Sequence, residues 1–439
     1  MIFFDRTNEI ATLLEIEELS HENAQFTIVT GRRRIGKTAL VLKAYEHIPI
    51  VYFFISRKPE TELCIEFQHE IENKTGIKMM GQANRFVELF EGIMNLAQTR
   101  PITLFIDEFQ EFLRVNPSVF SEMQRIWDLN HNRSNINLVV CGSVSSLISK
   151  IFTDRKEPLY NRQTRFMRIT PFKPNVLKEI MGYYHPDYTS DDLLTLYTLT
   201  GGVAKYVQLM IDSKSYTRVK MLKYIFRSDS VFLPEGKSVL IEEFGNEHTV
   251  YFAILAAIAS GKTKRNEIEE TIGKEVGGYL SRLENDYNII TRRQPLFEKT
   301  RTKNVRYFLN DNFFSFWFRF IYRYSYMLEV EAYDQLLEIT SRDFDVFSGV
   351  MLERYFREML TASHKYTRIG GWWDRKGENE IDIIAVDEIN RKADFYEVKR
   401  NPSKISLSQL QRKVNVFMAG THELQGYSVA IHGLSMDDM

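Results

Sequence analysis

Short apolar runs alternate with longer segments of mixed polarity through the first third of the chain. Four runs rich in β-branched and aromatic residues are expected to be strands, over residues 25–29, 50–55, 101–108 and 137–143. Helical segments lie between them, over residues 39–45, 60–75 and 83–98, and another helix precedes the first strand. This alternation predicts an α/β fold with a parallel sheet covered on both faces. Sites in such a sheet lie at the carboxyl ends of the strands.

The rest of the chain divides into segments with other patterns. Helical segments continue to about residue 213, and residues 246–310 then combine helices with two strand candidates, which predicts a winged helix-turn-helix. An aromatic helix follows, and the last hundred or so residues hold a helix over 347–363 and two further strands. We therefore expect a sheet domain, a helical lid, a winged helix, a helical connector and a C-terminal α/β domain, over residues 1–170, 171–245, 246–312, 313–340 and 341–439.

Composition narrows the class of protein. The 439 residues suffice for about three domains, and 44% apolar residues are ample for packed cores. The net charge of −1 gives no overall attraction to nucleic acid, although patches of opposite sign can lie within a neutral total. Cys64 and Cys141 have no metal-ligand spacing and exclude a disulfide framework. With no signal peptide and no apolar run long enough to span a bilayer, we expect a cytoplasmic protein with no membrane partner.

The strongest motif follows the first predicted strand and opens the next helix. It is the run Gly31-Arg32-Arg33-Arg34-Ile35-Gly36-Lys37-Thr38, followed by Ala39, and it fits the phosphate-binding loop G-x-x-x-x-G-K-[ST]. The glycines let backbone N–H groups face a phosphate, and the new helix directs its positive end at the same group. Lys37 can reach the β- and γ-phosphates of ATP, while the Thr38 hydroxyl can ligate Mg²⁺. The three arginines are expected to lie outside this cradle. The alternative is an ordinary glycine-containing turn.

Two acidic residues end the third predicted strand. Asp107 is expected to hold Mg²⁺ through water, and Glu108 to polarise the water that attacks the phosphate. Ser143, at the end of the fourth strand, could sense the γ-phosphate. Paired acids and serines at such positions are also common helix caps, which is the structural alternative for all three.

Arginines outside the loop are further candidates for the nucleotide site. Arg155, Arg162 and Arg165 cluster near the end of the sheet domain, and we select Arg162 as an arginine finger or sensor. Arg6 lies in the run from Phe4 to Glu9 that opens the first helix, and a short segment before the first strand often packs near the nucleotide base in this class of ATPase. The alternatives are surface arginines and a simple amphipathic helix.

The predicted winged helix carries basic residues suited to DNA phosphates. The candidate recognition helix covers residues 274–285 and exposes Arg282. The hairpin and its connection contribute Arg292, Arg293, Lys299, Arg301, Lys303 and Arg306. DNA is therefore an expected partner, although winged helices also serve as struts between domains. The nearby run Ser260-Gly261-Lys262-Thr263 is not a second phosphate loop, because Ala256 stands where the first glycine is required.

The C-terminal strands hold a second group of candidate catalytic residues. Asp382 begins one strand, and Glu397 and Lys399 end the next on one face. Two carboxylates can hold a metal ion and a lysine can orient water, which suits phosphodiester cleavage. Glu353 on the preceding helix could supply a further ligand. Charges that alternate by chance on an exposed strand are the alternative.

Several motifs together resemble a known family. F-x-R, GRRRIGKT, FIDEFQ, CGSVSSL, PLYNRQTRF, ITPF and TGGVAKYV occur in the order found in archaeal-type ATPases, a branch of the STAND P-loop NTPases related to AAA+ proteins. The resemblance covers residues 1–215 and implies ATP and Mg²⁺ as cofactors. One departure is Ala204, where the family has a proline that contacts the nucleotide region. The spacing D-x14-E-x-K resembles the PD-(D/E)XK nuclease core, and its segments resemble a domain that often follows these ATPases.

These observations predict an Mg²⁺-dependent ATPase coupled to DNA binding, with possible cleavage by a nuclease-like C-terminal domain. The alternative is a nucleotide-gated switch or DNA-binding regulator whose nuclease fold is inactive. The family resemblance allows either a homo-oligomer or a monomer.

Overall fold

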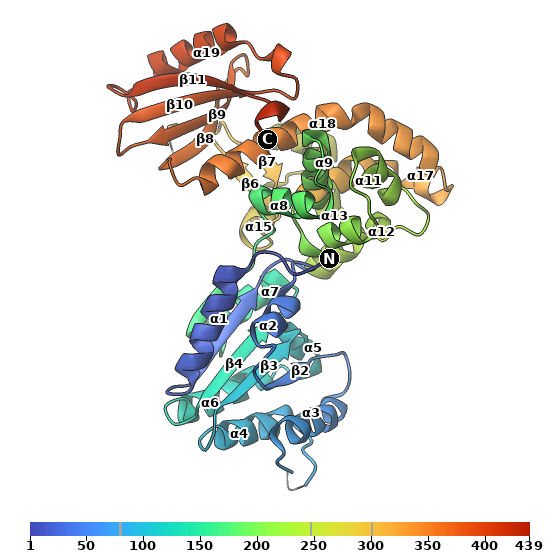
Figure 1. The fold of residues 1–439 in the computed structure, drawn as a ribbon, viewed down its shortest axis with the longest axis vertical. Helices are drawn as coiled ribbons and strands as arrows, with labels where there is room; N and C mark the ends of the chain where they lie inside the picture. Colours follow the sequence, from blue (N-terminus) through green and yellow to red (C-terminus); the bar gives the residue numbers. More distant parts are fainter. Residues whose placement is uncertain (79–80, 246–247, 300–301) are drawn as a thin grey trace. The chain divides into compact units, whose positions relative to one another are not determined.

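The computed structural model describes residues 1–78, 81–245, 248–299 and 302–439 (Figure 1). The chain forms two compact units. One comprises Phe4–Pro171, and the other comprises Phe172–Met439 together with Met1–Phe3. The N-terminal residues belong to the second unit through the Met1 amino group, which lies 2.7 Å from Asp212 Oδ1.

The first unit is built on a five-stranded sheet with the order β2-β3-β4-β1-β5. Every neighbouring pair is parallel, which confirms the predicted α/β class. The strands are β1 Gln25–Thr30, β2 Ile50–Phe54, β3 Ile102–Asp107, β4 Ile136–Cys141 and β5 Arg165–Arg168. All positions of β3 and β4 are buried, as in a sheet with both faces covered.

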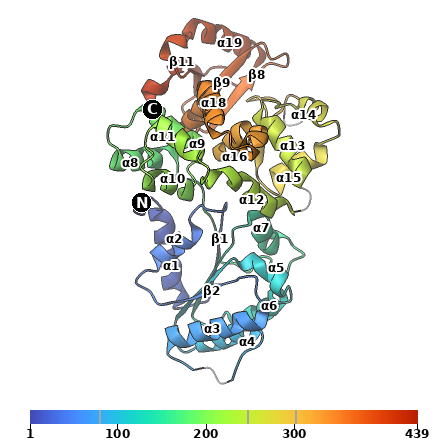
Figure 2. The ribbon, with the colours of Figure 1, turned by 90° about the vertical axis from the view of Figure 1, so that its right-hand side faces the viewer.

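Helices cover both faces of this sheet. They are α1 Thr7–Ser20, α2 Lys37–Ala44, α3 Glu60–Thr75, α4 Phe86–Leu96, α5 Phe112–Val115, α6 Val119–Asn130 and α7 Ser145–Thr153. Figure 2 shows α1 and α2 on one side of the strands and α5, α6 and α7 on the other. Aromatic residues dominate the core, where the Phe53 and Phe67 rings stack 4.2 Å apart. This packing fixes the carboxyl ends of β1, β3 and β4 relative to one another.

The second unit begins with helices and an antiparallel hairpin. The first helices are α8 Pro174–Tyr184, α9 Ser190–Thr200, α10 Ala204–Asp212, α11 Arg218–Ile225 and α12 Phe232–Phe244. Three more helices and two strands follow: α13 His248–Ala259, α14 Arg265–Ile272, α15 Gly277–Asn285, β6 Ile290–Arg293 and β7 Arg306–Leu309. The hairpin pairs Ile290 with Leu309. The elements expected from the sequence are thus present between residues 248 and 309.

The aromatic segment is buried, as its spacing predicts. It starts with α16 (Asn312–Phe316), passes through a π-helical turn over Trp317–Ile321 and a short turn, and ends in α17 (Ser325–Glu329). The Trp317 Nε1 donates to the Leu233 carbonyl at 2.9 Å. A Cβ on Gly236 would lie 2.2 Å from the Trp317 ring, so glycine is needed for this close packing. The segment is therefore core, not a cofactor site.

The C-terminal part has a mixed sheet of four strands with the order β11-β10-β9-β8. Its elements are α18 Tyr333–Ala362, β8 Arg368–Trp373, β9 Glu380–Asp387, β10 Lys392–Val398, α19 Leu407–Gly420 and β11 Ser428–Leu434. Only β10 and β11 are parallel, because α19 crosses between them and packs on Phe395. The continuous helix α18 spans the predicted boundary between residues 340 and 341, and the domain limits stay a prediction.

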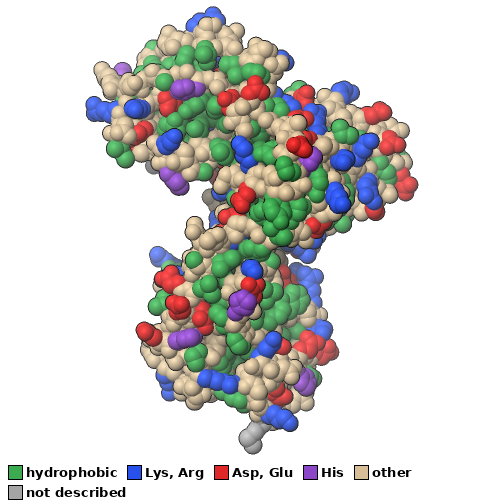
Figure 3. All heavy atoms as spheres, in the orientation of Figure 1, with side chains coloured by type: hydrophobic (Ala, Val, Ile, Leu, Met, Phe, Trp, Pro, Cys, Tyr) green, Lys and Arg blue, Asp and Glu red, His purple; other side chains and the backbone are tan. Residues whose placement is uncertain are grey.

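Lys and Arg side chains are interspersed with Asp and Glu over the face drawn in Figure 3. Across the described residues, every helix is too short or too polar to cross a membrane.

Candidate nucleotide-binding site

The loop between β1 and α2 has the backbone needed for a phosphate cradle. Gly31 and Gly36 have φ angles of 146° and 94°, in the region that favours glycine. A Cβ on Gly31 would lie 2.5 Å from the Ile169 carbonyl oxygen, so no other residue fits there. The buried Lys37 ammonium donates to the carbonyls of Gly31 and Arg32 at 3.0 and 3.2 Å. A cation therefore lies within the loop at the amino end of α2, where an anion would bind.

Asp107 is the centre of a hydrogen-bond network at the end of β3. Its carboxylate accepts from the Thr38 hydroxyl at 2.7 Å, the Tyr52 hydroxyl at 3.3 Å, the Cys141 thiol at 2.7 Å and the Glu108 N–H at 2.8 Å. Burial and the Asp107 charge raise the pKa of both the Tyr52 hydroxyl and the Cys141 thiol. Both groups are therefore neutral donors that orient the carboxylate.

Glu108 lies beside this network in a constrained conformation. Its φ of 55° places it in the left-handed region, which is costly for a residue with a side chain. Its Oε2 accepts from the Ser143 hydroxyl at 2.8 Å and from Gln110 Nε2. Gln110 packs closely against Gly142, where an added Cβ would lie 2.1 Å from Gln110 Oε1. The structure thus joins Glu108 to the predicted Ser143 and to Gln110, which sequence reasoning missed.

Tyr52 and Cys141 were also missed, although the sheet explains both. The strands β2 and β4 flank β3, and the pairing of Phe54 with Asp107 puts Tyr52 on the same face two residues earlier. Cys141 is the last residue of β4. Once the strand order is known, the period of two along each strand identifies them.

The donor set fits a magnesium nucleotide. The Thr38 hydroxyl and the Asp107 carboxylate are hard oxygen ligands at hydrogen-bond distance from each other, the type that Mg²⁺ prefers. Lys37 and the glycine-bounded loop would hold the phosphates. When bound, Mg²⁺ supplies positive charge that neutralises the phosphate oxygens.

The other predicted arginines have structural partners. Arg6, which is 5% exposed, donates from NH2 to the Thr170 carbonyl and from NH1 to Glu9 Oε1 at 3.0 Å. It thereby ties the start of α1 to the segment that closes on Gly31. Arg162 forms an ion pair with Asp128 of α6 at 3.1 Å. Its role as a sensor stays a prediction and would require Arg162 to leave Asp128.

The C-terminal candidates lie together across two strands. Tyr396 pairs with Ile383, so the next position places Glu397 opposite Asp382. Lys399 Nζ lies 3.3 Å from Asp382 Oδ2 and 3.8 Å from Glu397 Oε1. Backbone N–H groups of Val398 and Ser406 donate to the two carboxylates at 2.8 Å each. The three residues therefore form one compact charged group.

Glu353 does not complete a metal site with them. In the part of the chain that the structure describes, no three His, Cys, Asp or Glu side chains form a group that could hold a metal ion. Burial, followed by the charge of Asp382, raises the pKa of Glu353 to about 8. Near neutral pH Glu353 is therefore mostly a neutral acid, which is a poor ligand.

The hairpin β6–β7 packs against the C-terminal sheet, which changes the expectation for its arginines. Arg306 forms an ion pair with Glu380 at 2.9 Å and lies 4.5 Å over the Trp373 ring. Arg293 lies 4.7 Å over the Phe308 ring, and burial, with nearby arginines, lowers its pKa to about 9. These two arginines therefore make packing and ion-pair contacts within the second unit. Arg292, Lys299 and Lys303 remain at the surface, and Arg301 lies outside the described residues.

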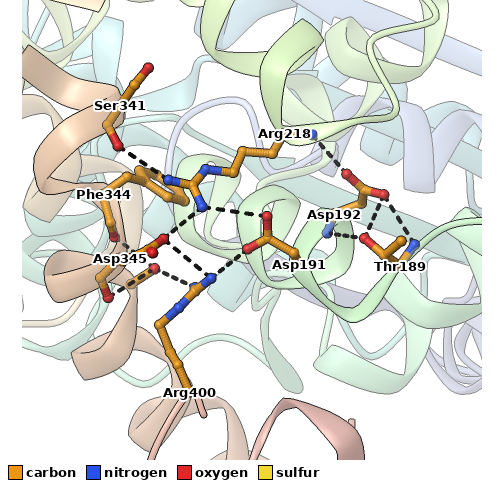
Figure 4. Close-up of polar contacts among 9 residues, drawn as sticks. Thr189, Asp191, Asp192, Arg218, Ser341, Phe344, Asp345 and Arg400 are labelled. Carbon is orange, nitrogen blue, oxygen red and sulfur yellow. Dashed lines mark hydrogen bonds and ion pairs between the residues drawn. The ribbon is translucent and has the colours of Figure 1, made fainter. Parts of the chain in front are cut away.

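A charged cluster joins the helices of this unit to Arg400, which follows β10 and Lys399 in the chain (Figure 4). Arg400 NH2 lies 2.6 Å from Asp191 of α9 and 3.4 Å from Asp345 of α18, and its NH1 donates to Ser348. Arg218 pairs with the same two carboxylates and lies 4.7 Å over the Phe344 ring. We call Asp191, Arg218, Asp345 and Arg400 the four-residue ion cluster.

The fold and this site define a P-loop nucleoside triphosphatase. Residues 3–210 match a family model described as an ATPase domain predominantly from Archaea, and residues 317–412 match one described as archaeal and bacterial proteins of unknown function. The uncharacterized protein MJECL04 of Methanocaldococcus jannaschii is 30% identical over 408 residues, which cover 91% of this chain and 87% of that protein. The chain therefore belongs to this archaeal ATPase family.

Solved structures support the fold. The Walker-type ATPase PABY2304 of Pyrococcus abyssi has a TM-score of 0.53 and 20% identity, and the match covers 72% of this chain and 96% of that chain. The ORC2 protein of Aeropyrum pernix, in ADPNP–ADP complexes, has a TM-score of 0.48 and 12% identity, with 77% and 95% covered. The first likeness shows the fold alone, and the second is too distant for a conclusion.

Proposed function

We propose that this protein is an Mg²⁺-dependent ATPase whose nucleotide state controls a DNA-directed C-terminal domain. One observation carries the ATPase assignment. The Thr38 hydroxyl, a candidate Mg²⁺ ligand, contacts Asp107, and the neighbouring Glu108 carboxylate is held by Ser143 and Gln110. In this arrangement, phosphate binding, metal binding and activation of water fall to different residues.

Lys37 and the loop bind the phosphates, and Thr38 with Asp107 would hold Mg²⁺. Glu108 is the base that accepts a proton from the attacking water, and Ser143 and Gln110 orient it. Because both donors contact the same Oε2 atom, Oε1 remains for the water. The helical lid and the winged helix would pass the nucleotide state to the C-terminal domain.

The test compares Lys37→Ala, Glu108→Gln and the matched control Glu111→Gln. Glu111 lies in the same turn but pairs with Arg57 at 3.0 Å. Lys37→Ala should lose ATP binding. Glu108→Gln should bind ATP and hydrolyse it at least about 100-fold more slowly, since a positioned general base contributes at least that factor. Turnover by Glu108→Gln at the wild-type rate would refute the assignment of the base.

A second candidate function is metal-dependent DNA cleavage by a restriction-endonuclease-like C-terminal domain. The compact group of Asp382, Glu397 and Lys399 favours it. Asp382 and Glu397 would hold the metal, and Lys399 would orient water. Against it, each carboxylate already accepts from a backbone N–H, and Glu353 adds no third ligand.

Plasmid nicking with Mg²⁺ or Mn²⁺ separates this candidate from its alternative. The proteins compared are wild type, Asp382→Ala, Lys399→Ala and the exposed control Lys392→Ala. Nicking that is lost in the first two variants and kept in the control supports cleavage. DNA binding without nicking under all metal and nucleotide conditions supports a STAND-type switch or DNA-binding regulator with an inactive nuclease fold. Native mass measurement with and without ATP tests whether a homo-oligomer forms.

A further inference from the structure

A cleft with a volume of about 1430 Å³ lies between the β6–β7 hairpin and the C-terminal sheet. One wall is the start of α14 with the hairpin connection, and the other is the end of β8 with the end of α19. It is separate from the nucleotide site, since all its lining residues belong to the second unit. Neither family match assigns a ligand to it, whereas the sequence predicts DNA phosphates as partners of Arg292, Lys299 and Lys303, which line it.

Most of the acidic residues in the cleft are already engaged. Glu269 pairs with Arg265 at 2.8 Å, and Glu298 lies 3.8 Å from Arg375 and accepts from Thr302 at 2.9 Å. Asp374 accepts from three backbone N–H groups and one amide of its own turn. The ion pairs neutralise Glu269 and Glu298, which leaves Asp374 and Glu423 as the two acidic residues of the lining without a cationic partner among the described residues.

Apart from Arg265 and Arg375, which form these ion pairs, four basic residues line the cleft. Lys264, Arg292, Lys299 and Lys303 line the cleft, and within the described residues no carboxylate forms an ion pair with any of them. Lys303 and Arg292 are exposed, and Lys264 is half-buried. The cleft thus presents an excess of unpaired positive charge, which attracts a polyanion.

Aromatic residues also line the cleft. The Trp372 and Phe417 rings lie 5.5 Å apart, and Phe297 lies 6.4 Å from Phe417. Trp372 and Phe297 are half-buried, so part of each ring faces the cleft. Cations beside accessible rings are the combination that binds a single nucleic-acid strand, because the backbone meets the charges and unpaired bases stack on the rings.

We propose that this cleft binds a single-stranded nucleic-acid segment, with phosphates on Lys264, Arg292 and Lys303 and a base on Trp372. A duplex fits less well, since its stacked and paired bases cannot stack on these rings. The inference deepens the proposed DNA-directed function and rests on it. Binding to the cleft itself requires neither ATP hydrolysis nor DNA cleavage. Polyanionic character alone would also admit an acidic peptide, which the experiment below treats as an outcome.

The test is fluorescence anisotropy with the full chain in EDTA, so that neither cleavage nor nucleotide turnover affects it. The probes are labelled oligodeoxythymidine, a duplex of the same length, and polyglutamate, titrated at several salt concentrations. The double variant Lys264→Ala/Lys303→Ala should weaken binding of the single strand at least about tenfold. It should also reduce the salt slope by about 1.4, because each phosphate contact on a single strand contributes about 0.7.

Trp372→Leu should weaken the same binding about tenfold with the salt slope unchanged, because a lost stacking contact carries no counterion term. Lys392→Ala, which removes an exposed charge outside the cleft, should bind like wild type. Thermal unfolding and ATPase turnover verify that each variant is folded.

Three outcomes overturn the proposal: equal affinity of the cleft variants and Lys392→Ala, tighter binding of the duplex, or tighter binding of polyglutamate. A wild-type protein that binds the duplex but not the single strand would refute the cleft alone. Absence of binding to any DNA would refute both the cleft and the proposed DNA-directed function.

Discussion

Replacing Arg400 by methionine tests whether the four-residue ion cluster holds the segment that follows β10 to the helices. Methionine keeps much of the side-chain volume and removes the guanidinium that contacts Asp191, Asp345 and Ser348. Arg400 and Asp191 are 17% and 30% exposed, while Asp345 is 63% exposed. The Asp191 contact should therefore dominate, and the Asp345 contact should add little because water screens it.

The free energy that Arg400→Met should cost follows from the burial of these side chains. Exposed ion pairs contribute about 0.5 kcal/mol, and loss of one partner from a fully buried pair costs about 3–5 kcal/mol. A partly buried, hydrogen-bonded pair lies between these limits, at about 2 kcal/mol. If local opening breaks this contact, the opening equilibrium should rise by about 30-fold. Arg400→Lys should give an intermediate value, because lysine cannot reach all three partners at once.

Hydrogen exchange with mass spectrometry measures this local opening directly. Peptides that cover residues 395–406 and 186–200 should exchange about 30-fold faster in Arg400→Met. The matched control is Arg342→Met on α18, whose arginine is 70% exposed and forms an ion pair with the neighbouring Asp343 at 2.8 Å. Exchange in Arg400→Met within twofold of this control would refute the view that the cluster joins the strand to the helices.

Three further predictions concern single positions. Gly31→Ala should abolish binding of a fluorescent ATP analogue, because its Cβ would lie 2.5 Å from the Ile169 oxygen; wild-type affinity would contradict this. Gly142→Ala should bind ATP but hydrolyse it more slowly in a steady-state assay, since its Cβ displaces Gln110; an unchanged rate would show that Gln110 is dispensable. Burial and a nearby carboxylate raise the pKa of Glu353 from 4.5 to about 8, so stability should fall as pH rises between these values. Glu353→Gln should remove this fall, and equal shifts of the melting temperature between pH 5.5 and 8 in both proteins would refute it.

The sequence predicts best those elements whose own residues show a clear apolar pattern. The strands β3 and β4 are continuous apolar runs because both faces of the sheet are covered. The edge strand β5 was missed, since Arg165 and Arg168 are exposed and it pairs with β1 alone. The strand β8 was missed too, because two glycines and a register shift between Gly370 and Trp372 hide its period.

The candidate sites were also predictable to different extents, because some depend on local spacing and others on contacts between distant segments. A phosphate loop is a local feature, so its residues are identified by spacing alone. The contacts of Asp107 with Tyr52 and Cys141 depend on strand order, which is not sequential. The engagement of Arg306 with Glu380 depends on packing between segments far apart in the chain. Charge clusters on a hairpin therefore do not by themselves indicate a free surface.

Lys399, which contacts Asp382, and Arg400, which belongs to the four-residue ion cluster, are neighbours in the chain. Successive side chains of an extended chain point to opposite sides, so Lys399 faces Asp382 while Arg400 faces Asp191 of α9. The Lys399 N–H still donates to the Leu434 carbonyl at 3.0 Å, which keeps this stretch in register with β11. A displacement of α9 that pulled on Arg400 would therefore rotate or shift Lys399 relative to Asp382. For this reason Arg400→Met should alter exchange at Val398 and Lys399 as well as in α9, whereas a purely local surface contact would alter only one of them.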